Sequence, residues 1–167
     1  MAPAFHLVCG STGAGKTTYS QALTERLHGV RFSIDEWMMG LFAKDQPEMI
    51  QFDWVMERVG RCEQQIGRVA TQCAQAGIAP VLDLSFLRAR DRARFAGIAA
   101  QAGCPVALHL LDVPAAERWN RIRIRNETRG ETFALTISQP IFDFFERIWE
   151  PPTPAEMSAY DGVNASS

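Results

Sequence analysis

Short, mainly apolar runs along the chain alternate with longer stretches in which apolar residues recur every three or four positions. Runs of about four to eight such residues fit buried strands, whereas the wider spacing places apolar side chains on one face of a helix. Strands are therefore predicted at residues 5–9, 31–34, 79–84 and 106–112. Helices between these strands predict an α/β fold, with a parallel sheet of four or five strands covered on both faces.

Two of the predicted helices have clear ends. A long amphipathic helix is predicted from Val55 to near Gly77, because apolar residues recur there at alternating four- and three-residue steps. Ser138 is placed to cap a later helix, which a group of prolines then stops. Residues 158–167 are expected to fray, apart from an edge segment around Tyr160.

The composition fits one globular domain spanning residues 1–167, because 47% of the residues are hydrophobic and 22% are charged. A net charge of -2 gives no general attraction for nucleic acid. The four cysteines form no CxxC pair, and we read neither a signal peptide nor a membrane-length apolar run, so a cytoplasmic protein with reduced thiols is expected. The three histidines are scattered, and we interpret them as structural.

The sequence GSTGAGKT at residues 10–17 matches the phosphate-binding pattern G-x-x-x-x-G-K-[ST], the Walker A motif, at every required position. Glycines let backbone N–H groups approach an anion closely, and the N-terminus of the following helix adds partial positive charge. Lys16 can reach the β- and γ-phosphates of a nucleotide, and the Thr17 hydroxyl is placed to ligate Mg²⁺. The residues expected to bind the nucleotide are Gly10, Ser11, Thr12, Gly13, Ala14, Gly15, Lys16, Thr17 and Thr18.

Two aspartates lie at the ends of predicted strands, where parallel sheets bind their ligands. Asp35 could accept the proton of an attacking hydroxyl, or it could cap the helix that begins with Glu36. Asp83 could hold Mg²⁺ through a water or orient Thr17, or it could serve the turn after its strand.

Two groups of arginines are candidates for anion binding. The first group has steps of three, four and four residues, which places its members on one helical face: Arg118, Arg121, Arg125 and Arg129. Few carboxylates lie nearby, so we expect an arginine-bearing lid at about residues 114–135 that binds the triphosphate, with a solvated basic face as the alternative. The second group lies at the start of another predicted helix, where its side chains either extend into solvent or bind an anion. Its members are Arg88, Arg90, Arg92 and Arg94.

Together these features resemble the small phosphate-loop kinases related to the kinase domain of phage-type polynucleotide kinase. The segments that carry the resemblance are the phosphate loop, FSIDEW at 32–37, Leu82-Asp83 and RNETRG at 125–130. Zeta toxins and chloramphenicol phosphotransferase are more distant members of that group. The resemblance covers residues 5 to about 152 and implies a three-layer P-loop NTPase fold and an AAA-type, ATP-binding kinase.

The resemblance also implies roles for individual residues. In that group the aspartate after the second strand is the general base, which corresponds to Asp35, and the lid arginines that contact phosphate match Arg125 and Arg129. This chain departs from polynucleotide kinase at Met38 and Met39, where that enzyme has a substrate-binding arginine. It also departs after Asp83, where Leu84-Ser85 replaces a threonine-asparagine pair.

We therefore expect a kinase that uses ATP and Mg²⁺ to phosphorylate a hydroxyl of a small molecule, with no membrane partner. Lys16, Asp35, Arg125 and Arg129 are the expected catalytic residues, and Arg118 and Arg121 are expected to bind the nucleotide. A group of large apolar residues could line an acceptor pocket or could belong to the core: Trp37, Met38, Met39, Phe42, Trp54 and Phe86.

Two alternative functions stay open. A 5′-hydroxyl nucleic-acid kinase needs a basic groove, which residues 88–94 and the lid could form. An ATP-dependent regulatory switch needs no acceptor, but switches usually position an attacking water, and no glutamate directly follows Asp83. The guanine-reading sequence N-K-x-D is absent from the chain, which favours ATP over GTP.

Overall fold

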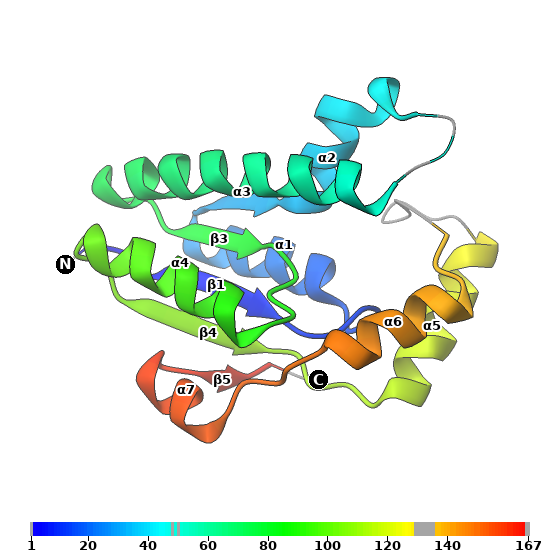
Figure 1. Cartoon of the computed structure of the whole chain (residues 1–167). Helices are drawn as coiled ribbons and strands as arrows, with labels where there is room; N and C mark the ends of the chain where they lie inside the picture. The colour runs from blue at the N-terminus through cyan, green and yellow to red at the C-terminus, as the bar shows by residue number, and fades with distance from the viewer. Residues whose placement is uncertain (1, 48, 50, 129–135, 166–167) are drawn as a thin grey trace.

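The computed structural model describes residues 2–47, 49, 51–128 and 136–165, and at its centre lies a sheet of five parallel strands (Figure 1). The strand order is β2-β3-β1-β4-β5. The strands are β1 (Phe5–Cys9), β2 (Val30–Ser33), β3 (Pro80–Asp83), β4 (Val106–Leu110) and β5 (Val163–Asn164). β1 and β3 lie inside the sheet and are almost wholly buried, as expected for apolar strands covered on both faces.

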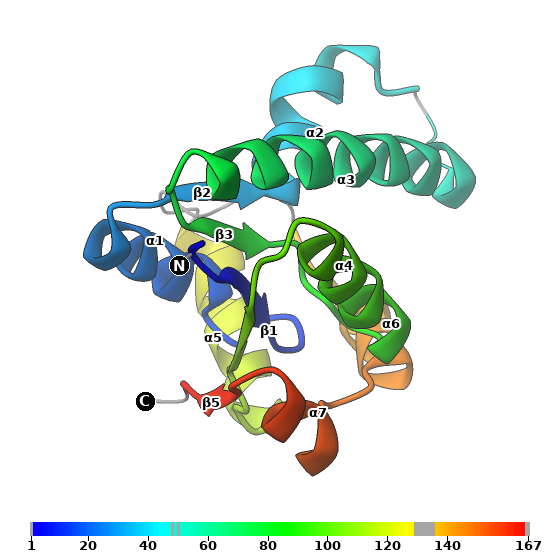
Figure 2. The same ribbon diagram turned by 90° about the vertical axis from the view of Figure 1, so that its left-hand side faces the viewer.

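Helices cover both faces of this sheet and extend beyond its carboxyl end. They are α1 (Lys16–Leu27), α2 (Ile34–Phe42), the short 3-10 helix η1 (Ala43–Asp45), α3 (Phe52–Gln75), α4 (Ala89–Gln101), α5 (Ala115–Thr128), α6 (Gln139–Ile148) and α7 (Pro154–Ala159). α1 packs with Val8 and Val81 on one face, whereas α3 and α4 pack with Leu7 and Leu82 on the other. Figure 2 shows these three layers nearly along the strands. The predicted α/β class and layered architecture are therefore confirmed.

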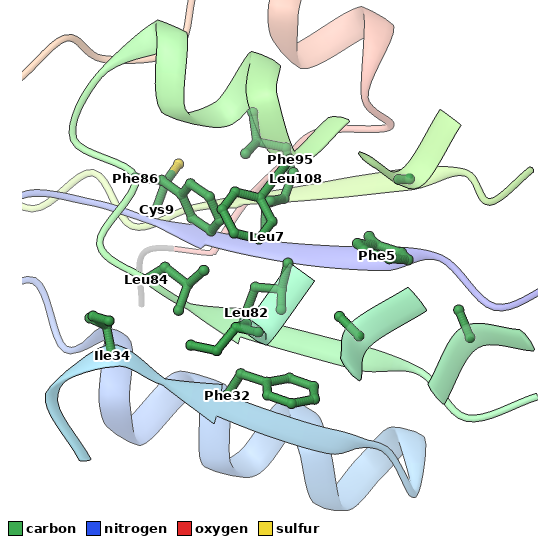
Figure 3. Close-up of a cluster of buried hydrophobic side chains, with 14 of the residues drawn as sticks. Phe5, Leu7, Cys9, Phe32, Ile34, Leu82, Leu84, Phe86, Phe95 and Leu108 are labelled. Atoms are coloured by element: carbon green, nitrogen blue, oxygen red, sulfur yellow. The ribbon is translucent and has the colours of Figure 1, made fainter. Parts of the chain in front are cut away.

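The larger core cluster lies between the sheet and the layer of α3 and α4 (Figure 3). Phe5, Leu7 and Leu108 from the strands meet Ile66 and Phe95 from the helices, and all five are inaccessible to solvent. Burying five large apolar side chains stabilises the fold by roughly 1.5–3 kcal/mol each. This packing fixes the carboxyl ends of β1 and β3, where the candidate functional residues begin.

α5 and α6 form a helical hairpin beyond the carboxyl ends of the strands (Figure 1). The hairpin has a small core of its own, in which Ile122, Ile137 and Phe142 are buried and Trp119 packs against them. Asn126 joins its two sides, because its Nδ2 donates to the Ile137 carbonyl at 2.8 Å and its Oδ1 accepts from the Ile137 amide at 3.2 Å. We call this unit the α5–α6 hairpin.

The predicted strands and helices occur within a few residues of their expected positions. Fraying was expected over residues 158–167, apart from an edge segment around Tyr160. In the described part of this segment α7 ends at Ala159, and β5 pairs with β4 at Val163–Asn164. The Leu108 amide donates to the Tyr160 carbonyl, and the Ala165 amide donates to the Leu110 carbonyl, which adds the segment to the sheet edge. Among the residues that the structure describes, no helix has both the length and the apolar character that crossing a membrane requires.

Candidate active site

A cavity of about 360 Å³ lies where the strands end and the α5–α6 hairpin begins. Three parts of the chain line it. The phosphate loop and the start of α1 contribute Thr12, Gly13, Gly15, Lys16, Thr17 and Thr18; the ends of β2 and β3 contribute Asp35, Asp83 and Ser85; and α5 contributes Arg121, Ile122 and Arg125. Most of the residues that the sequence singles out for chemistry therefore meet in one place.

The phosphate loop has the backbone that its glycines predict. Gly13 and Gly15 have φ values of 81° and 92°, in the left-handed region that glycine adopts without steric cost. A Cβ at position 13 would lie 2.8 Å from the Arg118 carbonyl oxygen, so only glycine fits there. Gly15 caps α1, and the N-terminus of that helix therefore points its partial positive charge at the cavity.

Lys16 holds its ammonium group against the loop's own backbone. Its Nζ donates to the Gly10 carbonyl at 2.8 Å and to the Ser11 carbonyl at 3.1 Å. Burial lowers the pKa of Lys16, and the nearby carboxylates of Asp83 and Asp35 act in the opposite direction. The two carboxylates therefore favour the charged ammonium form that would bind a phosphate.

Asp83 is 6% exposed, and its Oδ2 accepts two hydrogen bonds. The Ser20 hydroxyl donates at 3.0 Å, and Nη1 of Arg31 donates at 3.1 Å. Burial raises the pKa of Asp83, while the charge of Lys16 and these two donors lower it. Neither Ser20 nor Arg31 was expected from the sequence, because no motif places them beside this carboxylate.

The residues expected to hold Mg²⁺ fit such an ion chemically. The Thr17 hydroxyl and the Asp83 carboxylate line the same cavity, and oxygen ligands of this kind are those that Mg²⁺ prefers. A Mg²⁺ site of this type also uses phosphate oxygens and water, so two protein ligands are sufficient. Within the described part of the chain, no group of three or more His, Cys, Asp or Glu residues could hold a metal by itself.

Asp35 lies in the first turn of α2, is exposed, and lines the cavity. Its alternative role as a helix cap is wrong, because α2 begins at Ile34, two residues earlier than expected. Ser33 is the N-cap, and its hydroxyl accepts from the Glu36 amide at 3.4 Å. The carboxylate of Asp35 is therefore not used as a cap.

The arginines expected on one face of the lid have different environments where the structure describes them. Arg121 and Arg125 line the cavity, and the buried Nε of Arg125 has no hydrogen-bond partner among the described residues. Arg118 is a correction to the prediction, because it is 5% exposed and its guanidinium is bound to Glu146 instead of facing the cavity. Arg129 lies outside the described residues.

The second arginine group does not form a continuous basic surface. Arg92 is fully buried and makes a two-pronged ion pair with Glu156, at 2.9 and 3.0 Å. Arg94 pairs with Glu63, and Arg90 lies near Asp91. Of the two alternatives for the large apolar residues, the structure favours the core: Phe86 is a core residue, and Trp37, Met38 and Phe42 pack against that core. None of the six lines the cavity within the part of the chain that is described.

The turn after β3 brings Ser85 into the cavity by an unusual backbone conformation. Ser85 and Phe86 have φ values of 68° and 47°, which are rare for residues other than glycine. Buried contacts hold the turn: Phe86 packs edge-on against Phe95, and Nη1 of Arg92 donates to the Phe86 carbonyl at 3.1 Å. Sequence reasoning missed Ser85, since serine carries no signal for a left-handed backbone.

The sequence matches the family described as an AAA domain over residues 5–139. The chain belongs to this family. No curated protein matches the chain in sequence.

Solved structures similar to this AAA domain include kinases. A candidate kinase of Chloroflexus aurantiacus is 20% identical, with a TM-score of 0.73 over 92% of this chain and 84% of that chain. Kti12 of Chaetomium thermophilum, in complex with ADP-AlF3, is 13% identical, with a TM-score of 0.73 over 97% of this chain and 88% of that chain. The APS kinase CysC of Mycobacterium tuberculosis, in complex with AMPPNP and APS, is 16% identical, with a TM-score of 0.65 over 99% of this chain and 90% of that chain. The chain therefore has the P-loop kinase fold.

Proposed function

We propose that this AAA domain is an ATP-dependent phosphotransferase that moves the γ-phosphoryl group of ATP to a hydroxyl of a small molecule. The observation that carries the proposal is the shared cavity, which Lys16, Asp35 and Arg125 line together although they come from three parts of the chain. A phosphate loop alone serves many reactions. A carboxylate and a guanidinium facing the same space add a proton acceptor and stabilisation of charge, which phosphoryl transfer needs.

In this mechanism the loop amides and Lys16 hold the β- and γ-phosphates, and Lys16 exchanges its carbonyl partners for phosphate oxygens. Thr17 and Asp83 would hold Mg²⁺, which supplies positive charge to the same phosphates. The acceptor oxygen bonds to the γ-phosphorus as the bond to the bridging oxygen breaks, its proton passes to Asp35, and ADP leaves. Arg121 and Arg125 stabilise the charge of the group in transfer.

The charges around the cavity favour a small acceptor over a nucleic acid. Asp35, Asp83 and Ser85 line the cavity at the ends of the strands, and the nearby Arg31 is bound to Asp83 and Glu36. The exposed carboxylate of Asp35 would repel a phosphate backbone that approached it. The buried and paired arginines of α4 leave the expected nucleic-acid groove unsupported.

The relation to phage-type polynucleotide kinase, zeta toxins and chloramphenicol phosphotransferase is part of this proposal. It is supported by the position of Asp35 at the cavity, where that group has its general base. The proposed likeness concerns the transfer chemistry. The departures at Met38, Met39 and Leu84-Ser85 separate the acceptor from that of polynucleotide kinase.

The experiment that tests the proposal is transfer from γ-labelled ATP with Mg²⁺ to a panel of acceptors. The panel holds nucleosides, sugars, nucleotide sugars, aminoglycosides and 5′-hydroxyl oligonucleotides. We expect label in one class of small acceptor, and its loss by at least about a hundredfold in Asp35→Asn and in Lys16→Ala.

Three outcomes would contradict parts of the proposal. Label that appears in the oligonucleotides, with acceptor binding that weakens steeply with salt, would identify a nucleic-acid kinase. Label released only as inorganic phosphate, at the same rate in Asp35→Asn, would identify an ATP-dependent switch. Transfer that survives in Asp35→Asn would reject Asp35 as the proton acceptor and leave the phosphotransferase in place.

A further inference from the structure

One buried ion pair joins the phosphate loop to both helices of the α5–α6 hairpin. Arg118 on α5 donates through Nη1 and Nη2 to Oε1 and Oε2 of Glu146 on α6, at 2.8 and 2.7 Å. The Ser11 hydroxyl donates to the same Oε1 at 2.7 Å. Nη1 of Arg118 also donates to the Thr12 carbonyl at 3.1 Å, and its Nε donates to the Val113 carbonyl at 2.7 Å. All three nitrogens of the guanidinium are therefore in use.

The surroundings of the pair keep it in this geometry. The side chain of Arg118 is 6% exposed and that of Glu146 is 28% exposed. The buried ring of Phe142, part of the hairpin core, lies 5.3 Å from the guanidinium carbon. The hydrogen bonds from Arg118 are the main reason that the pKa of Glu146 is lowered, so its carboxylate is ionised at neutral pH and accepts from both Arg118 and Ser11.

A close backbone contact also joins the phosphate loop to α5, and we call this contact and the ion pair together the junction. Gly13 lies against the Arg118 carbonyl and the Ile122 side chain, so the loop rests directly on the first turns of α5. The same helix carries Arg121 and Arg125 to the cavity. The junction therefore sets where these two arginines stand relative to the amides that would bind phosphate.

We propose that Glu146 and Arg118 are positioning residues that hold the phosphate loop in its nucleotide-binding shape and place Arg121 and Arg125 beside it. Ser11 and Glu146 are 135 positions apart in the chain, and the phosphate-loop pattern includes neither partner of the ion pair. The inference rests on the nucleotide-binding part of the proposed function and is independent of the acceptor.

The test compares Glu146→Gln with Glu156→Gln. Each variant neutralises the carboxylate of a buried Arg–Glu pair, and the Arg92–Glu156 pair has no contact with the phosphate loop. We expect similar losses of stability in urea. Calorimetric titration with ADP and with AMPPNP, both with Mg²⁺, should show about tenfold weaker binding in Glu146→Gln and an affinity within about twofold of wild type in Glu156→Gln.

Ser11→Ala provides a second test that can be used if Glu146→Gln folds poorly. It removes one hydroxyl that donates to Glu146 and leaves the ion pair in place, so we expect a smaller loss of stability in urea than in Glu146→Gln and about threefold weaker ADP binding. Equal nucleotide affinity in wild type, Glu146→Gln and Ser11→Ala would overturn the proposal, as would equal losses in Glu146→Gln and Glu156→Gln. Nucleotide binding by wild type without transfer to any acceptor would reject the proposed function alone.

Discussion

Ser85 and Phe86 show how the backbone conformation of two residues can determine what lines a cavity. Both have left-handed φ values, which cost roughly 1–2 kcal/mol for a residue with a Cβ, and the buried contacts of Phe86 and Arg92 supply the compensation. A strained backbone of this kind persists only where the surrounding contacts hold it in place. At Ser85 the result is a hydroxyl beside Asp35 and Asp83.

We predict that two substitutions at Ser85 change the free energy of unfolding by different amounts. Ser85→Gly should leave the free energy of unfolding within about 1 kcal/mol of wild type, because relief of the strained φ offsets the larger entropy of the unfolded chain. Ser85→Val should lower it by about 2 kcal/mol or more, because a β-branched side chain opposes φ of 68°. Urea unfolding measures both. Equal stability of the two variants would show that the backbone at Ser85 is not left-handed in solution.

A second residue-scale feature is a chain of hydrogen bonds through two histidines on neighbouring strands. Nδ1 of His6 lies 3.0 Å from Nε2 of His109, and the Tyr19 hydroxyl lies 2.8 Å from Nδ1 of His109. Burial, followed by His6 and Arg26, lowers the pKa of His109 from 6.5 to about 4, and burial also lowers the pKa of His6. The folded protein therefore favours the neutral rings.

This arrangement predicts a loss of stability in mild acid. Histidines in the unfolded chain take up protons as the pH falls below about 6.5, whereas His109 in the folded protein resists them until about pH 4. The stabilisation is complete above pH 6.5 and should fall by about 1–2 kcal/mol between pH 7 and pH 5. Urea unfolding at both pH values measures it. His109→Gln should flatten this dependence, and the exposed control His28→Asn should not; a flat profile in wild type would contradict the prediction.

At the scale of elements, the α5–α6 hairpin has a small core in its described part, and Asn126 is one of the side chains that connect its two sides. Asn126 makes two hydrogen bonds to the backbone of Ile137. Because the hairpin core is small, these bonds and the Arg118–Glu146 ion pair are expected to contribute to holding α5 and α6 together. Arg125, the neighbour of Asn126, lines the cavity, so this connection also bears on the site.

We predict that Asn126→Ala loosens the hairpin more than the core of the sheet. Two lost hydrogen bonds, one leaving a half-buried carbonyl without its partner, should cost about 1–2 kcal/mol. Hydrogen exchange should quicken at the amides of α5 and α6 and stay unchanged in β1 and β3. Gln139→Ala is the matched control, because its side-chain bond to Asp143 is exposed and should contribute less than about 0.5 kcal/mol. Faster exchange in all elements alike would contradict a local role.

At the scale of the whole molecule, the sequence predicts the features that local patterns determine, but it does not predict contacts between side chains that are far apart in the chain. The phosphate loop and the strand ends at Asp35 and Asp83 are local patterns, so their meeting at one edge follows from a parallel sheet. The partners of the buried arginines are far apart in sequence, and no spacing connects Arg118 with Glu146 or Arg92 with Glu156. The sequence therefore led us to expect Arg118 at the nucleotide. Arginines on one helical face can include residues that bind a ligand and residues that stabilise the fold.

Arg92 joins segments that lie far apart in the chain. It lies on α4, is fully buried, and binds Glu156 of α7 and the carbonyls of Phe86 and Glu150. It therefore connects the turn beside the cavity to the segment that adds β5 to the sheet. A buried guanidinium without its carboxylate is costly, because no water replaces the lost partner.

We predict that Glu156→Gln lowers the free energy of unfolding by about 3 kcal/mol at pH 7. Glu63→Gln is the control, because its partner Arg94 is 44% exposed and the pair should contribute less than about 1 kcal/mol. Hydrogen bonds from Arg92 lower the pKa of Glu156 below 4.5, so the stabilisation is present above that pH and is lost as the pH falls further. The difference between wild type and Glu156→Gln should therefore shrink between pH 6 and pH 3. An unchanged difference would mean that the carboxylate is not what holds Arg92.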